Sequence, residues 1–282
     1  MLEFFSAIVS NDVLFVRYAL IASALSSLPL GMIGSFVVVR NMGAIAGAIG
    51  HSIVGGVGLA VYLQVVLRLK WATPQLGALV FAIFSGLVIA WLSIRGRQRL
   101  DTAINTVWVV GMSLGLVFLS LTPTYTDPMS YLFGNILLIS ESDLLIIGIL
   151  SLVVVSTVVG FYPQLQSISF DEEFSRVRGL PVNLLNTLLL LLVAITVFLM
   201  IQVVGILMVI ALVTLPAAIS SLFHKKLLAI MTSSAILTFI FLFLGIMVSF
   251  VFNLPTGPTT VLILGSTYGF AVLVVGKLRS LQ

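Results

Sequence analysis

One histidine of this chain lies deep within an apolar stretch, where its imidazole could take part in binding or transport. It belongs to a stripe of residues spaced four apart: Gly43, Gly47, His51 and Gly55. On a helix these positions share one face, and glycines there let a second backbone approach closely. A neutral imidazole is a ligand suited to zinc, manganese and iron. His51 is therefore a candidate metal ligand and the three glycines are candidate pore-lining positions, with a packed, hydrogen-bonded histidine as the alternative.

The residue types missing from the apolar stretches narrow the chemistry further. The chain has no cysteine, which excludes disulfides, thiolate metal sites and cysteine nucleophiles. None of its nine acidic residues falls in the interior of an apolar span, whereas carriers driven by protons or sodium ions usually keep a buried carboxylate. No GxxxxGK[ST] or HExxH sequence occurs. We expect no enzyme activity and no permanently bound cofactor, so active transport would take its energy from ATP on another subunit.

The elements that position His51 follow from the composition. Hydrophobic residues make up 60% of the chain and charged residues 8%, with a mean hydropathy of +1.27. A water-facing surface needs far more charge than this, and so does a nucleic-acid interface. The sequence therefore predicts an all-α polytopic membrane protein surrounded by lipid, with no nucleic-acid partner and with residues 1–282 forming a single transmembrane domain.

Apolar runs of spanning length predict eight or nine transmembrane helices. The expected spans are 13–39, 44–66, 74–94, 103–122, 143–161, 184–201, 203–222, 227–251 and 258–276. The count stays open because only Gln202 and Gly205 interrupt the apolar run between the sixth and seventh spans.

The distribution of basic residues predicts the orientation. With nine crossings and the N-terminus outside, ten of the thirteen basic residues face the cytoplasm: Arg40, Arg95, Arg97, Arg99, Arg176, Arg178, Lys225, Lys226, Lys277 and Arg279. Loops rich in lysine and arginine stay on the cytoplasmic side of a membrane. The C-terminus is therefore expected in the cytoplasm.

The segment 162–183 predicts a short charged helix outside the membrane. Ser169 or Asp171 can cap its start, and Gly179 and Pro181 stop it. Phe170, Phe174 and Val177 form one apolar edge of this helix. Acidic residues in its first turn and basic residues in its last turn suit the helix dipole. These charged residues are Asp171, Glu172, Glu173, Arg176 and Arg178. A solvated connector and a docking helix for a cytoplasmic protein both fit this pattern.

Several stretches together resemble the membrane permease subunit of the bacterial ABC importers for zinc, manganese and iron. They cover nearly the whole chain in the expected order: 34–60, 99–121, 131–140, 170–186, 202–218 and 254–263. The sequence FDEEFSRVRGLP is similar to the family's coupling helix, which sits in a groove of the ATPase. The resemblance thus favours docking for the residues from Phe170 to Gly179.

The resemblance also implies partners and a location. The permease would dimerise with a second copy or a paralogue, above a pair of cytoplasmic ABC ATPases, in the bacterial cytoplasmic membrane. An extracytoplasmic metal-binding protein would deliver the divalent metal, which is the substrate, so the chain would serve metal homeostasis. A permease for a chelated metal and a membrane scaffold without transport are the alternatives.

One departure from the family pattern lies in the glycine stripe. The permeation site of the family usually reads GDALSHA, with an aspartate and a histidine four apart. Here the histidine is kept as His51, and Gly47 stands at the position of the aspartate. One copy would then offer a nitrogen ligand without charge compensation for a divalent cation. Two copies, a paralogue that supplies the carboxylate, or a chelated substrate would each be compatible with this change.

Overall fold

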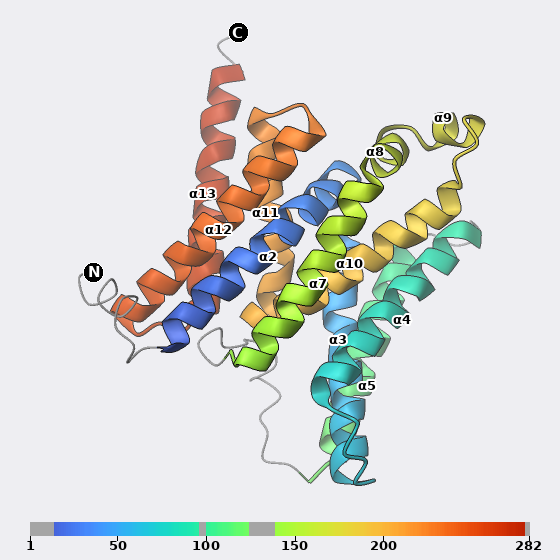
Figure 1. Cartoon of the computed structure of the whole chain (residues 1–282), viewed down its shortest axis with the longest axis vertical. Helices are drawn as coiled ribbons and strands as arrows, with labels where there is room; N and C mark the ends of the chain where they lie inside the picture. Colours follow the sequence, from blue (N-terminus) through green and yellow to red (C-terminus); the bar gives the residue numbers. More distant parts are fainter. Residues whose placement is uncertain (1–13, 96–99, 124–138, 280–282) are drawn as a thin grey trace. The chain divides into compact units, whose positions relative to one another are not determined.

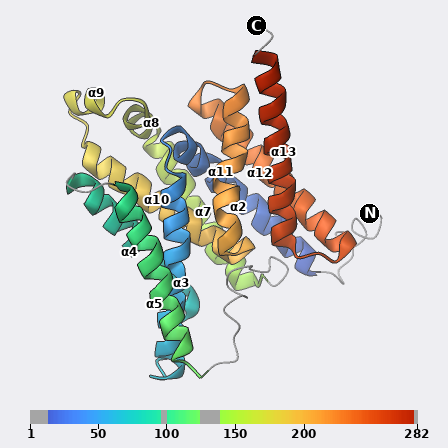
Figure 2. The same cartoon turned by 180° about the vertical axis from the view of Figure 1, so that it is seen from behind.

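The computed structural model describes residues 14–95, 100–123 and 139–279 (Figures 1 and 2). Every regular element in these residues is an α-helix, and eight of the helices are long and apolar enough to cross a membrane. A helix satisfies its own backbone hydrogen bonds, which lipid cannot do. The predicted all-α membrane fold is confirmed. Arg97, Arg99 and most of the family-like segment 131–140 lie outside the described residues.

The chain divides into two compact units. Unit 1 takes its residues from Met1–Val39, Phe133–Ser156 and Leu199–Gln282, and unit 2 from Arg40–Leu132 and Thr157–Phe198. His51 and the segment 162–183 both belong to unit 2. The expectation of a single transmembrane domain stays a prediction.

Unit 1 is a set of apolar helices packed through small residues. It contains α2 (Leu14–Val39), most of α7 (Glu141–Gly160), α11 (Ile206–Phe223), α12 (Leu227–Phe252) and α13 (Thr256–Arg279). Helix α2 packs against α11 and α12, and α13 packs against the same two helices. A Cβ at Gly31 of α2 would collide with the backbone of Ala235 on α12. Membrane helices associate closely through such small residues.

Unit 2 is built around the helix that carries His51. It contains α3 (Gly43–Val65), α4 (Pro74–Arg95), α5 (Leu100–Ser120), α8 (Tyr162–Phe170), α9 (Glu172–Val177) and the first part of α10 (Val182–Val204). Helix α3 packs along α5 and α4 (Figure 2). In its most apolar 18-residue window 89% of the residues are buried, against 28% in α5. The helix that carries His51 is therefore more buried than α4 and α5, which pack against it.

The break between α10 and α11 accounts for the ambiguity in the number of spans. Gly205 has φ 81°, a left-handed conformation that glycine adopts without steric cost, and it separates the two helices. Helix α10 reaches spanning length, whereas the apolar part of α11, Met208–Phe223, is shorter than a typical span. The described residues thus hold eight helices of spanning length and one shorter apolar helix.

The segment 162–183 contains one more helix than the sequence predicted. Helix α8 (Tyr162–Phe170) precedes α9, with Pro163 in its first turn. Proline suits that position, because the first amides of a helix have no partner within the helix. The predicted short charged helix is present as α9, and Gly179 follows it with φ 80°.

Candidate functional site

The imidazole of His51 lies between α3 and α5. It stacks on the indole of Trp108 with ring centroids 4.4 Å apart and an interplanar angle of 8°. The side chain is buried, and its Nδ1 has no hydrogen-bond partner among the described residues. Buried polar atoms normally have one. This histidine is therefore packed through its ring face, and its buried Nδ1 is left without a hydrogen bond.

One glycine of the stripe on α3, Gly55, makes a close approach to neighbouring helices. A Cβ at Gly55 would lie 2.6 Å from the carbonyl oxygen of Gly111 on α5 and 2.9 Å from the ring of Phe81 on α4. Gly47 is buried and Gly43 is partly exposed. Within unit 2, Gly55 thus allows helix packing, and a pore-lining role for the three glycines stays a prediction.

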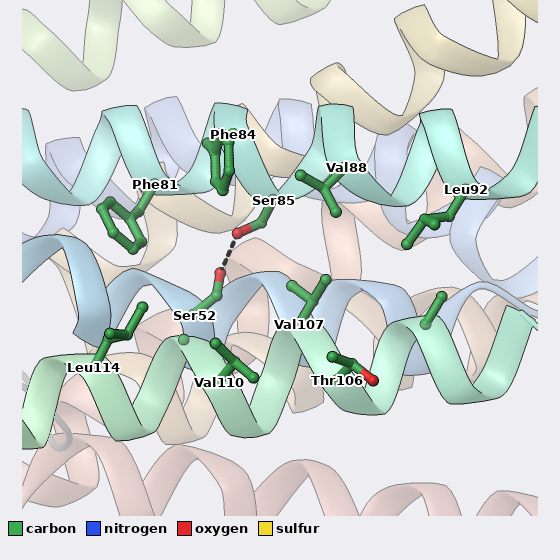
Figure 3. A pocket seen from close by; sticks show the side chains of 12 residues that line it. Ser52, Phe81, Phe84, Ser85, Val88, Leu92, Thr106, Val107, Val110 and Leu114 are labelled. Carbon is green, nitrogen blue, oxygen red and sulfur yellow. Dashed lines mark hydrogen bonds between the residues drawn. The ribbon is translucent and has the colours of Figure 1, made fainter.

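A cavity of about 230 Å³ is lined by Ser52 of α3 and by side chains of α4 and α5, and Figure 3 shows it from close by. Side chains of α4, including Phe84 and Val88, face side chains of α5, including Val107 and Val110, across it (Figure 3). The hydroxyl of Ser52 bonds that of Ser85 at 2.7 Å. The third polar side chain of the lining, Thr106, donates to the carbonyl of Thr102 at 2.7 Å, so the remaining side chains that line the cavity are apolar. His51 is not among the residues that line it.

Helix α9 presents apolar side chains outside the spans. The carboxylate of Asp171 accepts a hydrogen bond from the backbone N–H of Phe174 at 2.9 Å, which caps the helix as expected. Phe174 is 50% exposed and Val177 86% exposed, and Phe170 is exposed beside them. Ser175 faces inward and is buried. The helix thus presents an apolar edge among charged residues.

A cluster of three polar side chains near α9 was not predicted. Arg40 pairs with Glu172, and its Nη1 donates to Oδ1 of Asn186 at 2.7 Å. The Asn186 amide nitrogen also donates to Glu172 Oε1 at 3.1 Å. These residues come from three separate parts of the sequence. The sequence shows that they are polar, but it does not show that they lie close together in the fold.

The described residues hold no group of three or more histidine and acidic side chains that could bind a metal ion. Among these residues, His51 would therefore offer a metal ion one nitrogen ligand, and its role as a ligand stays a prediction. One ligand cannot hold a metal as a permanent structural ion, which needs four in a zinc site. It can serve a passing ion, provided that further ligands come from a second copy, from water or from the metal's own chelator.

Several known proteins are similar to this chain over most of its length. A probable metal transport system membrane protein of Chlamydia trachomatis is 34% identical over 91% of this chain and 87% of its own. The manganese transport system membrane protein MntC of Listeria monocytogenes is 30% identical over 93% of this chain and 91% of its own.

Solved structures share the fold. A structure of PsaBC from Streptococcus pneumoniae in complex with Fab superposes with a TM-score of 0.82 at 27% identity, covering 96% of this chain and 94% of that one. A putative metal-chelate type ABC transporter in an inward-facing conformation has a TM-score of 0.72 at 18% identity, covering 93% and 88%. That second likeness concerns the fold alone.

The family model described as ABC 3 transport family matches residues 12–275. The match includes both His51 with its glycine stripe and the segment that forms α9. With a model that spans nearly the whole sequence and relatives of similar length at 30% identity or more, this chain belongs to the ABC 3 transport family of membrane permeases.

Proposed function

We propose that this chain is the permease subunit of an ATP-driven ABC importer that moves a divalent transition metal across the bacterial cytoplasmic membrane. Zinc, manganese and iron are the candidate metals. Manganese comes first because the relatives from Listeria monocytogenes and Streptococcus gordonii are named for manganese transport or import.

The observation that carries this proposal is the apolar edge of α9. Phe170, Phe174 and Val177 are exposed on a charged element that is too short to cross a membrane. Exposed apolar groups framed by polar residues are typical of protein interaction sites. We assign this edge to a groove of a cytoplasmic ABC ATPase. If α10, α11, α12 and α13 each cross the membrane, the C-terminus lies on the same cytoplasmic side. ATP is then bound and hydrolysed on the partner, and this chain is no enzyme.

His51 supplies the substrate contact in this scheme. The one unprotonated nitrogen of its neutral imidazole binds the metal weakly. Weak binding suits a site that an ion must leave as well as enter. A second permease, either a copy or a paralogue, adds ligands to the same path. An extracytoplasmic metal-binding protein delivers the ion from outside.

ATP binding and hydrolysis would then shift the permease between two conformations that open to opposite sides of the membrane. Such a shift requires that the ATPase bind the two conformations with different affinity. Movement of α9 is the link between the two proteins.

The test is ATP-dependent uptake by the purified complex. The chain is tagged, purified from its native membrane with its bound subunits, and reconstituted in liposomes that contain ATP. Metal-loaded binding protein is added outside. We expect accumulation of radioactive manganese that stops when the trapped nucleotide cannot be hydrolysed. Uptake only of a chelated metal would establish the chelate permease instead, and absence of both a bound ATPase and uptake would establish the scaffold.

A further inference from the structure

The polar cluster of Arg40, Glu172 and Asn186 joins three elements of unit 2. Arg40 lies in the turn that leads into α3, Glu172 is the first residue of α9, and Asn186 lies in the first turns of α10. The guanidinium engages the two other side chains through different nitrogens, and Asn186 in turn donates to Glu172. The three side chains therefore form a closed hydrogen-bonded ring, called here the Arg40 cluster.

Burial makes the Arg40 cluster dependent on all its members. The side chain of Arg40 is 16% exposed and that of Glu172 is 42% exposed. Burial lowers the pKa of the Arg40 guanidinium, and the Glu172 carboxylate acts in the opposite direction. The group stays protonated at any physiological pH. A charge withdrawn from water needs its counter-charge, so removing Glu172 leaves the guanidinium of Arg40 poorly compensated, whereas Glu172 keeps contact with water.

Side chains do not completely fill the region between α9 and α3, because a cavity lies next to the Arg40 cluster. A cavity of about 300 Å³ is lined by all three cluster residues, and also by Met42 and Ile45 at the start of α3. Apolar contacts can transmit a displacement only where atoms touch. Across this cavity, the hydrogen bonds of the Arg40 cluster directly join α9 to the turn before α3.

The turn after Arg40 is short and internally bonded. Asn41 has φ 54°, and the carbonyl of Met42 accepts hydrogen bonds from the N–H groups of Ile45 and Ala46 at 3.0 and 3.3 Å. Helix α3 then runs from Gly43 without a break past His51. At 1.5 Å per residue, His51 lies about 12 Å along the axis from Gly43. A displacement of Arg40 would therefore displace the N-terminal end of α3, the helix that carries His51.

We propose that Arg40 is a positioning residue that couples the docking helix to the histidine helix, through Glu172 and with Asn186 holding both. This inference rests on the proposed function, in which α9 docks the ATPase. Movement of α9 is passed to α3 through the Arg40 cluster, so ATP hydrolysis and displacement of His51 occur together. An ion pair that only stabilised the fold would have no such effect on the ratio of transport to hydrolysis.

The experiment measures ATP hydrolysis and manganese uptake on the same reconstituted complexes. Arg40→Ala removes the hydrogen bonds from Arg40 to Glu172 and Asn186. Arg40→Lys keeps the positive charge but lacks the planar guanidinium that reaches two acceptors. The double variant Arg40→Met with Glu172→Met removes these hydrogen bonds without leaving an unpaired charge, which is the costly situation. Lys70→Gln, which removes an exposed positive charge in the loop between α3 and α4, is the matched control.

We expect Arg40→Ala and the double methionine variant to lower uptake about tenfold while ATP hydrolysis stays within about twofold of the wild type, as for a lost coupling between two sites. Arg40→Lys should fall between them and the wild type, and Lys70→Gln should match the wild type. Should Arg40→Ala fail to assemble, the double methionine variant decides alone.

Normal uptake by the double methionine variant overturns the inference, because Arg40 and Glu172 would then only compensate each other's charge. So does an equal fall in uptake and hydrolysis, which would place the residues in ATPase docking. Failure of the proposed function is seen separately, since the wild-type complex itself would then show no ATP-dependent uptake.

Discussion

The imidazole of His51 on α3 lies face to face with the indole of Trp108 on α5, with ring centroids 4.4 Å apart. The stack uses the faces of both rings, so it restrains the imidazole without occupying its nitrogens. Nδ1 has no partner among the described residues. Because stacking fixes the orientation of the imidazole, the nitrogen lone pair that would bind a metal is already oriented. Less conformational entropy is then lost when the metal binds.

Replacement of Trp108 should therefore weaken metal binding while leaving the ligand in place. An aromatic pair contributes about 0.5–1.5 kcal/mol beyond the area it buries. Trp108→Ala should raise the manganese concentration for half-maximal uptake by about three- to tenfold. Trp108→Phe, which can still stack, is the control and should change it little. An unchanged concentration dependence in Trp108→Ala would show that the stack does not position the ligand.

Contact between α3 and α5 requires glycine at position 111. A Cβ there would lie 2.6 Å from both the Cα and the Cβ of Ser52, and backbone cannot yield as a side-chain end can. Gly111→Ala should destabilise the protein by about 1–3 kcal/mol, the usual cost of overpacking. Thermal unfolding in detergent measures this.

The matched control for that substitution is Gly265→Ala on α13, where a Cβ meets no atom within 4 Å. Alanine is the better helix former, so this variant should keep or slightly raise the melting temperature. Equal melting temperatures for the two variants would contradict the close packing of α3 on α5.

The cap of α9 can be tested by itself. Asp171→Ala removes the acceptor for the Phe174 N–H and should cost the helix about 1 kcal/mol, whereas Asp171→Asn keeps a good cap. Amide hydrogen exchange within 172–177 should become about fivefold faster in the alanine variant. Exchange that is equally fast in both variants would mean that the negative charge, rather than the cap, holds the helix.

A carboxylate at position 47 should change the choice of metal. Gly47 lies four residues before His51, so an aspartate there shares its face of α3. Carboxylate oxygen suits manganese, whereas imidazole alone favours zinc. Gly47→Asp should raise the ratio of manganese to zinc uptake in competition. Gly47→Asn supplies similar bulk without charge, and the same ratio in both variants would mean that position 47 does not face the ion.

The helices of this protein could be predicted because each carries its own local signal. Apolar runs gave the spans, and the Asp171 cap with Gly179 gave the ends of α9. Helix α8 was not predicted, although Pro163 is well placed in its first turn.

The site could be predicted only in part. His51 is recognisable because an imidazole is rare in an apolar span, and its glycines because of their spacing. Trp108 and Asn186 carry no such signal, since their roles come from contacts between residues far apart in the sequence. Arg40 looks like an ordinary cytoplasmic charge until the fold brings it to Glu172.

The most direct test of the central claim compares manganese uptake by the wild-type complex and by His51→Ala. Both are reconstituted with the same bound subunits and ATP, and ATP hydrolysis is measured in parallel to verify assembly. If His51 contacts the ion on its path, the alanine variant should lose at least about tenfold in uptake at low metal concentration, because a metal–nitrogen contact is removed. Unchanged uptake at every concentration would contradict the assignment of His51 to the metal path.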